Sequence, residues 1–138
     1  MNITVNWLKK DFHMEAGNEE GGQIRIDGNT KIGGLEGGMS PMQLLLAGIG
    51  GCSAIDVISI LEKQKQKLTD LVVEVDADRQ KLKEGYSEFK TIHLHFKLSG
   101  ELDEKKVKRA LDLSITKYCS VSKALEKGSE ISYDFELV

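Results

Sequence analysis

One stretch of the chain, residues 44–61, is almost continuously apolar. Drawn as a helix it has almost no polar face, so neighbouring elements must cover it on most sides. Ser40, Pro41 and Gln43 precede it, and a Ser-x-x-Gln capping pattern with proline at the first helical position is typical of a helix start. We therefore predict a long buried helix from Ser40 to Lys67 at the centre of the fold.

The same stretch is about as long as a membrane-spanning helix requires. Asp56 interrupts it, and a charge near the middle of a bilayer costs at least about 2.5 kcal/mol. We therefore predict a core helix and no membrane partner. Glycines at 48, 50 and 51 each cost about 1 kcal/mol in a helix, so we expect another backbone or a substrate to approach closely there.

Around this helix, apolar and polar residues alternate with period two, which predicts strands with one buried face. The predicted strands run from Ile3 to Trp7, Phe12 to Glu15, Gln23 to Asp27, Leu71 to Asp76, Glu88 to Leu98, and Ile131 to Leu137. The first of them form a meander, and residues 31–39 form a glycine-rich loop. The predicted fold is mixed α+β, with antiparallel strands around the central helix in one domain, residues 1–138.

A second helix is predicted to begin near Asp103, because acidic residues favour a helix N-terminus. This helix breaks near Cys119, and either Ser120 or Ser122 caps a further short helix that stops at Gly128. The helix that begins near Asp103 is predicted to bury Val107, Ala110 and Leu111.

Charge and cysteine content narrow the functional classes. Lys and Arg number 19 against 22 Asp and Glu, giving a net charge of −3 without a basic block, so we expect no nucleic-acid partner. The N-terminus lacks the pattern of a signal peptide, which favours a cytoplasmic location. Two cysteines are too few for a disulfide scaffold and are expected to be free thiols.

Cys52 is the leading candidate for chemistry. A cysteine in an apolar helix is often only a small buried hydrophobe, but a nucleophilic thiol needs small neighbours that let a ligand reach its sulfur. Cys119 follows Lys117 and precedes Lys123 near a helix N-terminus, features that lower a thiol pKa. The alternative for Cys119 is a surface thiol. Sequence spacing leaves open whether the two sulfurs meet.

His93 and His95 share one face of a predicted strand, a spacing that two ligands of one metal ion can have. No third ligand is evident, and Lys97 occupies the next position on that face. We therefore interpret them as solvated strand histidines and predict neither a metal nor a cofactor.

Two segments resemble the OsmC/Ohr family. The run SPMQLLLAGIGGCSAIDV, residues 40–57, is similar to the family's central helix, and YCSVSKAL, residues 118–125, is similar to its second cysteine motif. The order of strands and helices matches over essentially the whole chain. The sequence is most similar to the family's YhfA-like branch.

This resemblance implies an α+β protomer in an intertwined homodimer, with thiol peroxidase chemistry at two sites. Cys52 is then the peroxidatic thiolate that reduces an organic hydroperoxide, and Cys119 is the resolving thiol. A dithiol or lipoyl reductant restores both thiols.

The sequence departs from the family at its charged residues. The family glutamate ten residues before the first cysteine is Met42 here, and the nearest candidate for the family arginine is Arg25. Met42, Gln43, Gly48 and Gly51 are the candidate substrate-binding residues. Two hypotheses follow: an organic hydroperoxide reductase, or a relative without efficient peroxidase activity that binds a small apolar ligand or catalyses another thiol reaction.

Overall fold

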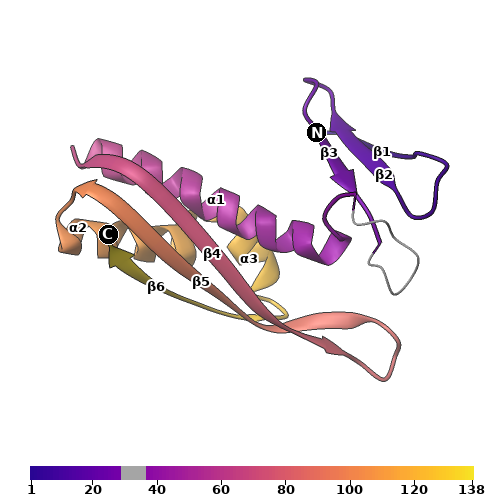
Figure 1. Cartoon of the computed structure of the whole chain (residues 1–138). Coiled ribbons are helices and arrows are strands. Elements are labelled where there is room, and N and C mark those ends of the chain that lie inside the picture. Colours follow the sequence, from indigo (N-terminus) through magenta and orange to yellow (C-terminus); the bar gives the residue numbers. More distant parts are fainter. Residues whose placement is uncertain (29–36) are drawn as a thin grey trace. The chain divides into compact units, whose positions relative to one another are not determined.

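The computed structural model describes residues 1–28 and 37–138, and these form two compact units (Figure 1). The first unit comprises residues 1–45 and the second residues 46–138. Most of the predicted loop at residues 31–39 lies outside the described residues. The assignment of residues 1–138 to a single domain stays a prediction.

The first unit contains a three-stranded antiparallel sheet. Its strands are β1 (Ile3–Trp7), β2 (Met14–Asn18) and β3 (Gln23–Ile26), in the order β1-β2-β3. The predicted meander is therefore confirmed. The second strand begins later than predicted. The apolar residues of β1 are exposed within this chain.

The second unit contains another three-stranded sheet, in the order β4-β5-β6. β4 (Lys67–Lys81) and β5 (Ser87–Glu101) form a long antiparallel pair, whereas β6 (Glu130–Leu137) runs parallel to β5 (Figure 1). The prediction of antiparallel strands alone is therefore wrong at β6. The reason is that the helices between β5 and β6 return the chain to the end of the sheet at which β5 begins. A parallel connection requires such a return.

The inner face of β5 carries the core of the second unit. Four alternating residues are fully buried, as the period-two pattern predicts; they are Ile92, Leu94, Phe96 and Leu98. On β6, the ring of Tyr133 meets that of Phe96 edge to face, with centroids 6.5 Å apart. Leu137, which the pattern places inside, is 43% exposed near the end of this edge strand.

Helix α1 (Pro41–Lys63) begins as predicted. The backbone N–H of Ser40 donates to Oε1 of Gln43 at 2.9 Å, and the N–H of Gln43 donates to Oγ of Ser40 at 3.2 Å, which confirms the capping box. The helix ends before the predicted Lys67 because Lys65 adopts a left-handed conformation with φ of 58°. The N–H of Gln66 then bonds to the carbonyl of Leu61, the arrangement that commonly ends a helix.

One side of α1 is buried and the other is not. Ile49, Ser53, Val57 and Leu61 are fully buried, whereas Ile55 is 70% exposed. The prediction of an all-round buried helix therefore holds for one face of the single chain. By length and composition alone α1 is also able to cross a membrane, as core helices of soluble proteins often are.

Three helical segments connect β5 to β6. They are α2 (Glu104–Leu113), the π-helical turn η2 (Ser114–Tyr118) and α3 (Ser120–Leu125). The side chain of Asp103 caps α2, and the predicted inward residues of α2 are fully buried. The cap of α3 is Cys119 itself rather than a serine, because its sulfur accepts the N–H of Ser122.

Candidate active site

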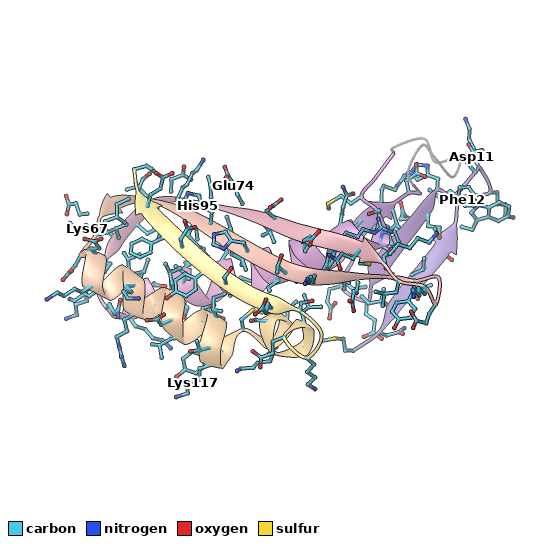
Figure 2. The ribbon with its side chains drawn as sticks, turned by 90° about the horizontal axis from the view of Figure 1, so that it is seen from below. Asp11, Phe12, Lys67, Glu74, His95 and Lys117 are labelled. Carbon is cyan, nitrogen blue, oxygen red and sulfur yellow. The ribbon has the colours of Figure 1, made fainter. Side chains whose placement is uncertain are left out.

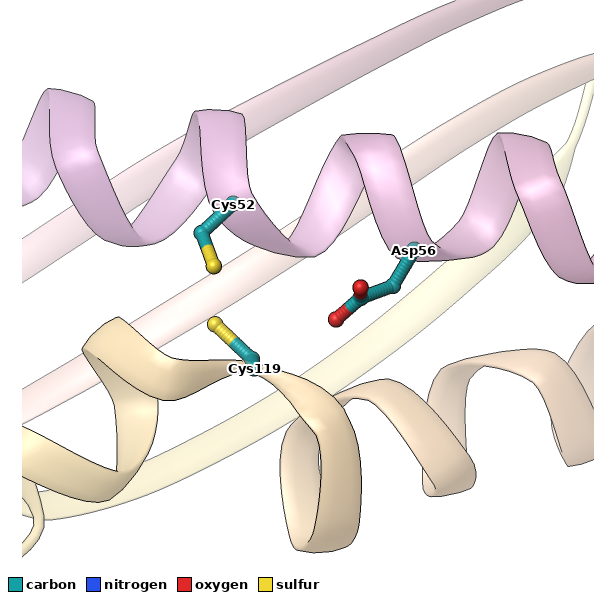
Figure 3. A group of neighbouring side chains, drawn as sticks. All are labelled: Cys52, Asp56 and Cys119. Atoms are coloured by element: carbon teal, nitrogen blue, oxygen red, sulfur yellow. The ribbon is translucent and has the colours of Figure 1, made fainter.

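Two thiols and one carboxylate meet in the second unit. Cys52 and Asp56 lie one turn apart on the same face of α1, and Cys119 faces them from the junction of η2 and α3 (Figure 3). The two sulfurs and a carboxylate oxygen all lie within 4.8 Å of one another. The structure thus brings together the two cysteines whose contact the sequence left open.

The break between η2 and α3 orients Cys119. The wide π-helical turn closes with a 2.7 Å hydrogen bond from the N–H of Cys119 to the carbonyl of Ser114. Cys119 then takes an extended conformation with ψ of 103°. Its buried sulfur accepts the N–H of Ser122 at 3.3 Å. The predicted helix break at Cys119 is therefore confirmed, and it turns the thiol inward.

The electrostatic environment of Cys119 differs from the sequence prediction. Burial raises the pKa of the Cys119 thiol to about 11, and neighbouring Cys52 and Asp56 add to this increase. The prediction that Lys117 and Lys123 lower this pKa is wrong. Lys117 lies over the ring of Tyr118 at 5.1 Å, and Lys123 pairs with Glu126, the residue that follows α3.

Asp56 is held in place by a buried serine, Ser114. Oγ of Ser114 donates to Oδ2 of Asp56 at 3.0 Å and lies 3.0 Å from Oγ of Ser53. Both serines are fully buried. From the sequence, Asp56 was only an interruption of the apolar stretch. Its four-residue spacing from Cys52, which places both side chains on one helix face, was the signal that could have identified it.

A cavity of about 470 Å³ adjoins this cluster at Asp56. Residues of α1 and of the α2–η2 segment line it; they are Asp56, Ser59, Ile60, Lys63, Leu113 and Tyr118. Cys52 is partly exposed, whereas Cys119 is fully buried. A small molecule bound in this cavity would lie beside Asp56, whose carboxylate oxygen is within 4.8 Å of both sulfurs.

The glycines before Cys52 have different surroundings. A Cβ on Gly50 would lie only 3.1 Å from Cγ2 of Val75, so this glycine lets α1 pack closely on β4. A Cβ on Gly48 would meet Val121 at an ordinary 3.7 Å. At Gly51, apart from its chain neighbours and the nearby backbone of its own helix, no atom of the described residues lies within 4 Å of that position. The close approach at Gly50 is thus made by a valine side chain and not by another backbone, while the approach of a substrate stays a prediction.

The remaining predicted site residues belong to the first unit. Arg25 on β3 pairs through Nε with Glu15 at 3.0 Å. Gln43 uses its side-chain oxygen in the helix cap. The participation of Arg25, Met42 and Gln43 in a site with Cys52 stays a prediction.

The fold and the site define a class of protein: an α+β scaffold in which a long helix and a helix junction place two thiols side by side. The sequence pattern of the family described as OsmC-like protein matches residues 33–134. The chain therefore belongs to the OsmC family, and the resemblance stated from the two cysteine motifs is confirmed.

Individual relatives agree with this assignment. The chain is 43% identical to the protein YhfA of Escherichia coli K12 over 139 residues, covering 100% of this chain and 98% of that protein. An OsmC-like protein from Mycoplasma pneumoniae has a TM-score of 0.83 at 23% identity, with 99% and 96% of the two chains covered. The organic hydroperoxide resistance protein OhrB of Bacillus subtilis has a TM-score of 0.69 at 17% identity, with 98% and 96% covered. At these identities the two structures show the shared α+β fold.

Proposed function

We propose that this protein is a thiol-dependent peroxidase that reduces organic hydroperoxides in oxidative stress defence. The observation that carries the proposal is the distance of at most 4.8 Å between the sulfurs of Cys52 and Cys119. Two thiols at this separation need only a small movement to form a disulfide. The helix junction at Cys119 is a place where the backbone can make that movement, because it has fewer hydrogen bonds than a helix interior.

The surroundings of the two thiols support different roles. Cys52 is partly exposed and follows Gly51, where the described residues leave open space. Cys119 is fully buried, and its pKa is raised to about 11, so it is the poorer first nucleophile. Cys52 is accordingly the peroxidatic residue and Cys119 the resolving residue.

The reaction has two steps. The thiolate of Cys52 attacks one oxygen of the hydroperoxide, the O–O bond breaks, and the alkoxide takes a proton to leave as an alcohol. Cys52 becomes a sulfenic acid. Cys119 then attacks the sulfur of Cys52, and the hydroxide leaves with the Cys119 proton as water while the disulfide forms. A dithiol or lipoyl reductant donates two electrons and two protons to restore both thiols.

The proposed functional unit is a cytoplasmic homodimer. The 70% exposure of Ile55 on α1 supports it, because a second copy of the chain is a suitable cover for an apolar helix face.

A second candidate function is a family member without efficient peroxidase activity, which binds a small apolar ligand or takes part in another thiol reaction. Met42 stands where the resemblance implies a glutamate. The carboxylate of Asp56 also lies within 4.8 Å of both sulfurs and raises the pKa of the Cys119 thiol. Both observations favour this candidate over fast peroxide reduction.

A peroxide-consumption assay with a dithiol reductant separates the two candidates. We expect faster turnover with a bulky organic hydroperoxide than with hydrogen peroxide, and none in Cys52→Ser. Cys119→Ser should form a sulfenic acid that accumulates or overoxidises. Unchanged turnover in Cys52→Ser would contradict the peroxidase proposal.

A further inference from the structure

We propose that the reduced protein binds one Zn²⁺ ion through Cys52, Asp56 and Cys119. From the sequence, only the strand histidines were candidate metal ligands, because residue spacing does not show that Cys119 and Asp56 lie together beside Cys52. This proposal does not depend on peroxidase activity, since it concerns what the reduced thiols bind rather than what they reduce.

The ligand set fits zinc in type and in distance. Thiolate sulfur and carboxylate oxygen are both common zinc ligands, and thiolates favour zinc over magnesium or calcium. In a tetrahedral site with Zn–S bonds of about 2.3 Å, two sulfurs lie about 3.8 Å apart. The three ligand atoms here already lie within 4.8 Å of one another, so small side-chain movements suffice to close the site.

The backbone directs the three ligand side chains toward one another (Figure 3). Cys52 and Asp56 project from successive turns of one rigid helix, a spacing that helical metal sites also use. Cys119 faces them from the η2–α3 junction. Each coordinating thiol loses its proton to solvent as its sulfur binds the ion.

Second-layer hydrogen bonds also resemble those of a metal site. Ser114 donates to one oxygen of Asp56 at 3.0 Å, and the N–H of Ser122 donates to the sulfur of Cys119 at 3.3 Å. Such outer partners orient metal ligands and stabilise their charged forms. Both interactions are present before any ion is bound, so the site is prepared for one.

The charge of the cluster changes when an ion binds. Binding removes the protons of both thiols, which with the carboxylate then carry three negative charges, and none of residues 1–28 or 37–138 forms an ion pair with Asp56. A divalent cation at the centre of the three ligand atoms compensates most of that charge. A bound zinc ion therefore fits the ligand geometry and compensates the charge that its own binding creates.

Three protein ligands leave the fourth zinc position open to water or to a small ligand. The cavity of about 470 Å³ beside Asp56 provides room for either. Because the same sulfurs form the proposed disulfide, zinc binding and disulfide formation exclude each other. Zinc-loaded protein should therefore alkylate at Cys52 at least about tenfold more slowly than chelator-treated protein.

Metal titration of the reduced, chelator-treated full chain tests the proposal. We expect one Zn²⁺ per chain by competition with a colorimetric chelator, and a sulfur-to-cobalt charge-transfer absorption band when Co²⁺ replaces zinc. The double variant Cys52→Ser with Cys119→Ser should lose both signals. Ser114→Ala should weaken binding by about 10-fold to 100-fold. His95→Gln, which changes an exposed strand face, is the matched control and should bind like the unchanged protein.

Measurements on the wild-type protein alone can overturn the proposal. The outcome therefore does not depend on whether a variant folds. Absence of a cobalt–thiolate band in the reduced wild-type chain would contradict it, as would zinc binding that survives conversion to the disulfide. The assay of peroxide consumption is run on chelator-treated protein without zinc. Failure of zinc binding and failure of peroxidase activity are therefore seen separately.

Discussion

Oγ of Ser114 donates a 3.0 Å hydrogen bond to Oδ2 of Asp56, which joins the π-helical turn to the central helix beside the two thiols. The same hydroxyl lies 3.0 Å from Oγ of Ser53. Ser114 and Ser53 are fully buried, so water does not replace a partner that Oγ of Ser53 loses.

Replacing Ser114 with alanine should therefore destabilise the fold. We expect Ser114→Ala to lower the free energy of unfolding by about 1–3 kcal/mol, because it leaves the buried Oγ of Ser53 without its Ser114 partner. Urea unfolding measures this change. Thr116→Ala, on the exposed side of the same turn, is the control and should change the stability by no more than about 0.5 kcal/mol. Equal effects of the two substitutions would contradict the role assigned to Ser114.

The two glycines before Cys52 should respond differently to alanine. At Gly50 a new Cβ meets Val75 at 3.1 Å, so crowding opposes the gain of about 1 kcal/mol in helix propensity. At Gly51 the described residues leave space for the methyl group. We expect Gly51→Ala to be more stable than Gly50→Ala by about 1–2 kcal/mol in thermal or urea unfolding. The reverse order would contradict the packing of α1 on β4.

A ladder of side chains crosses the outer face of the second sheet, where Glu74 and His95 are labelled in Figure 2. His93 bonds to Asp134 at 2.9 Å, and His95 bonds to Asp134 at 2.6 Å and to Glu136 at 3.2 Å. Hydrogen bonds to Asp134 and then to Glu136 raise the pKa of His95 above its ordinary 6.5. Hydrogen bonds from His95 and then from His93 lower the pKa of Asp134 below its ordinary 3.8.

These shifts set a pH window for stability. The contribution of His95 is fully present below pH 6.5 and is lost as the pH rises through its raised pKa. The contribution of Asp134 is present above pH 3.8 and is lost as the pH falls through its lowered pKa. We expect His95→Gln to destabilise the fold more at about pH 5.5 than at about pH 9 in urea unfolding. A destabilisation that does not change with pH would contradict this account, because it would show that the charges of His95 and Asp134 do not contribute to stability.

The exposed face of α1 should be an interface between two copies of the chain. Ile55 is 70% exposed there, and we expect sedimentation at low micromolar concentration to give a species near twice 15.3 kDa. Ile55→Glu should shift this species toward the monomer, because it places a charge in an apolar contact. Val72→Glu, at a residue of β4 that is 44% exposed, is the matched control and should remain dimeric. A folded monomer of the unchanged protein would contradict this expectation.

Local patterns predicted much of the fold. The capping residues Ser40 and Gln43 marked the start of α1, and the alternation along β5 identified its buried face. The acidic residues near Asp103 marked the start of α2. These features depend on residues that are close together in the chain. They can therefore be predicted from a single sequence.

Features that depend on tertiary structure were not predictable in the same way. The parallel pairing of β6 depends on the path of the helices before it, and no strand pattern records that path. The raised pKa of Cys119 depends on burial against α1, whereas sequence proximity indicated two lysines that lie elsewhere. The role of Asp56 became visible only when the fold placed Cys119 beside it.

The most direct test of the central claim is peptide mapping after one equivalent of a bulky organic hydroperoxide is added to reduced, chelator-treated protein. We expect an internal disulfide between Cys52 and Cys119, with the loss of two hydrogens from the chain, and no such disulfide in Cys52→Ser or Cys119→Ser. Consumption of the hydroperoxide with both thiols still free, or oxidation of Cys52 without linkage to Cys119, would contradict the account.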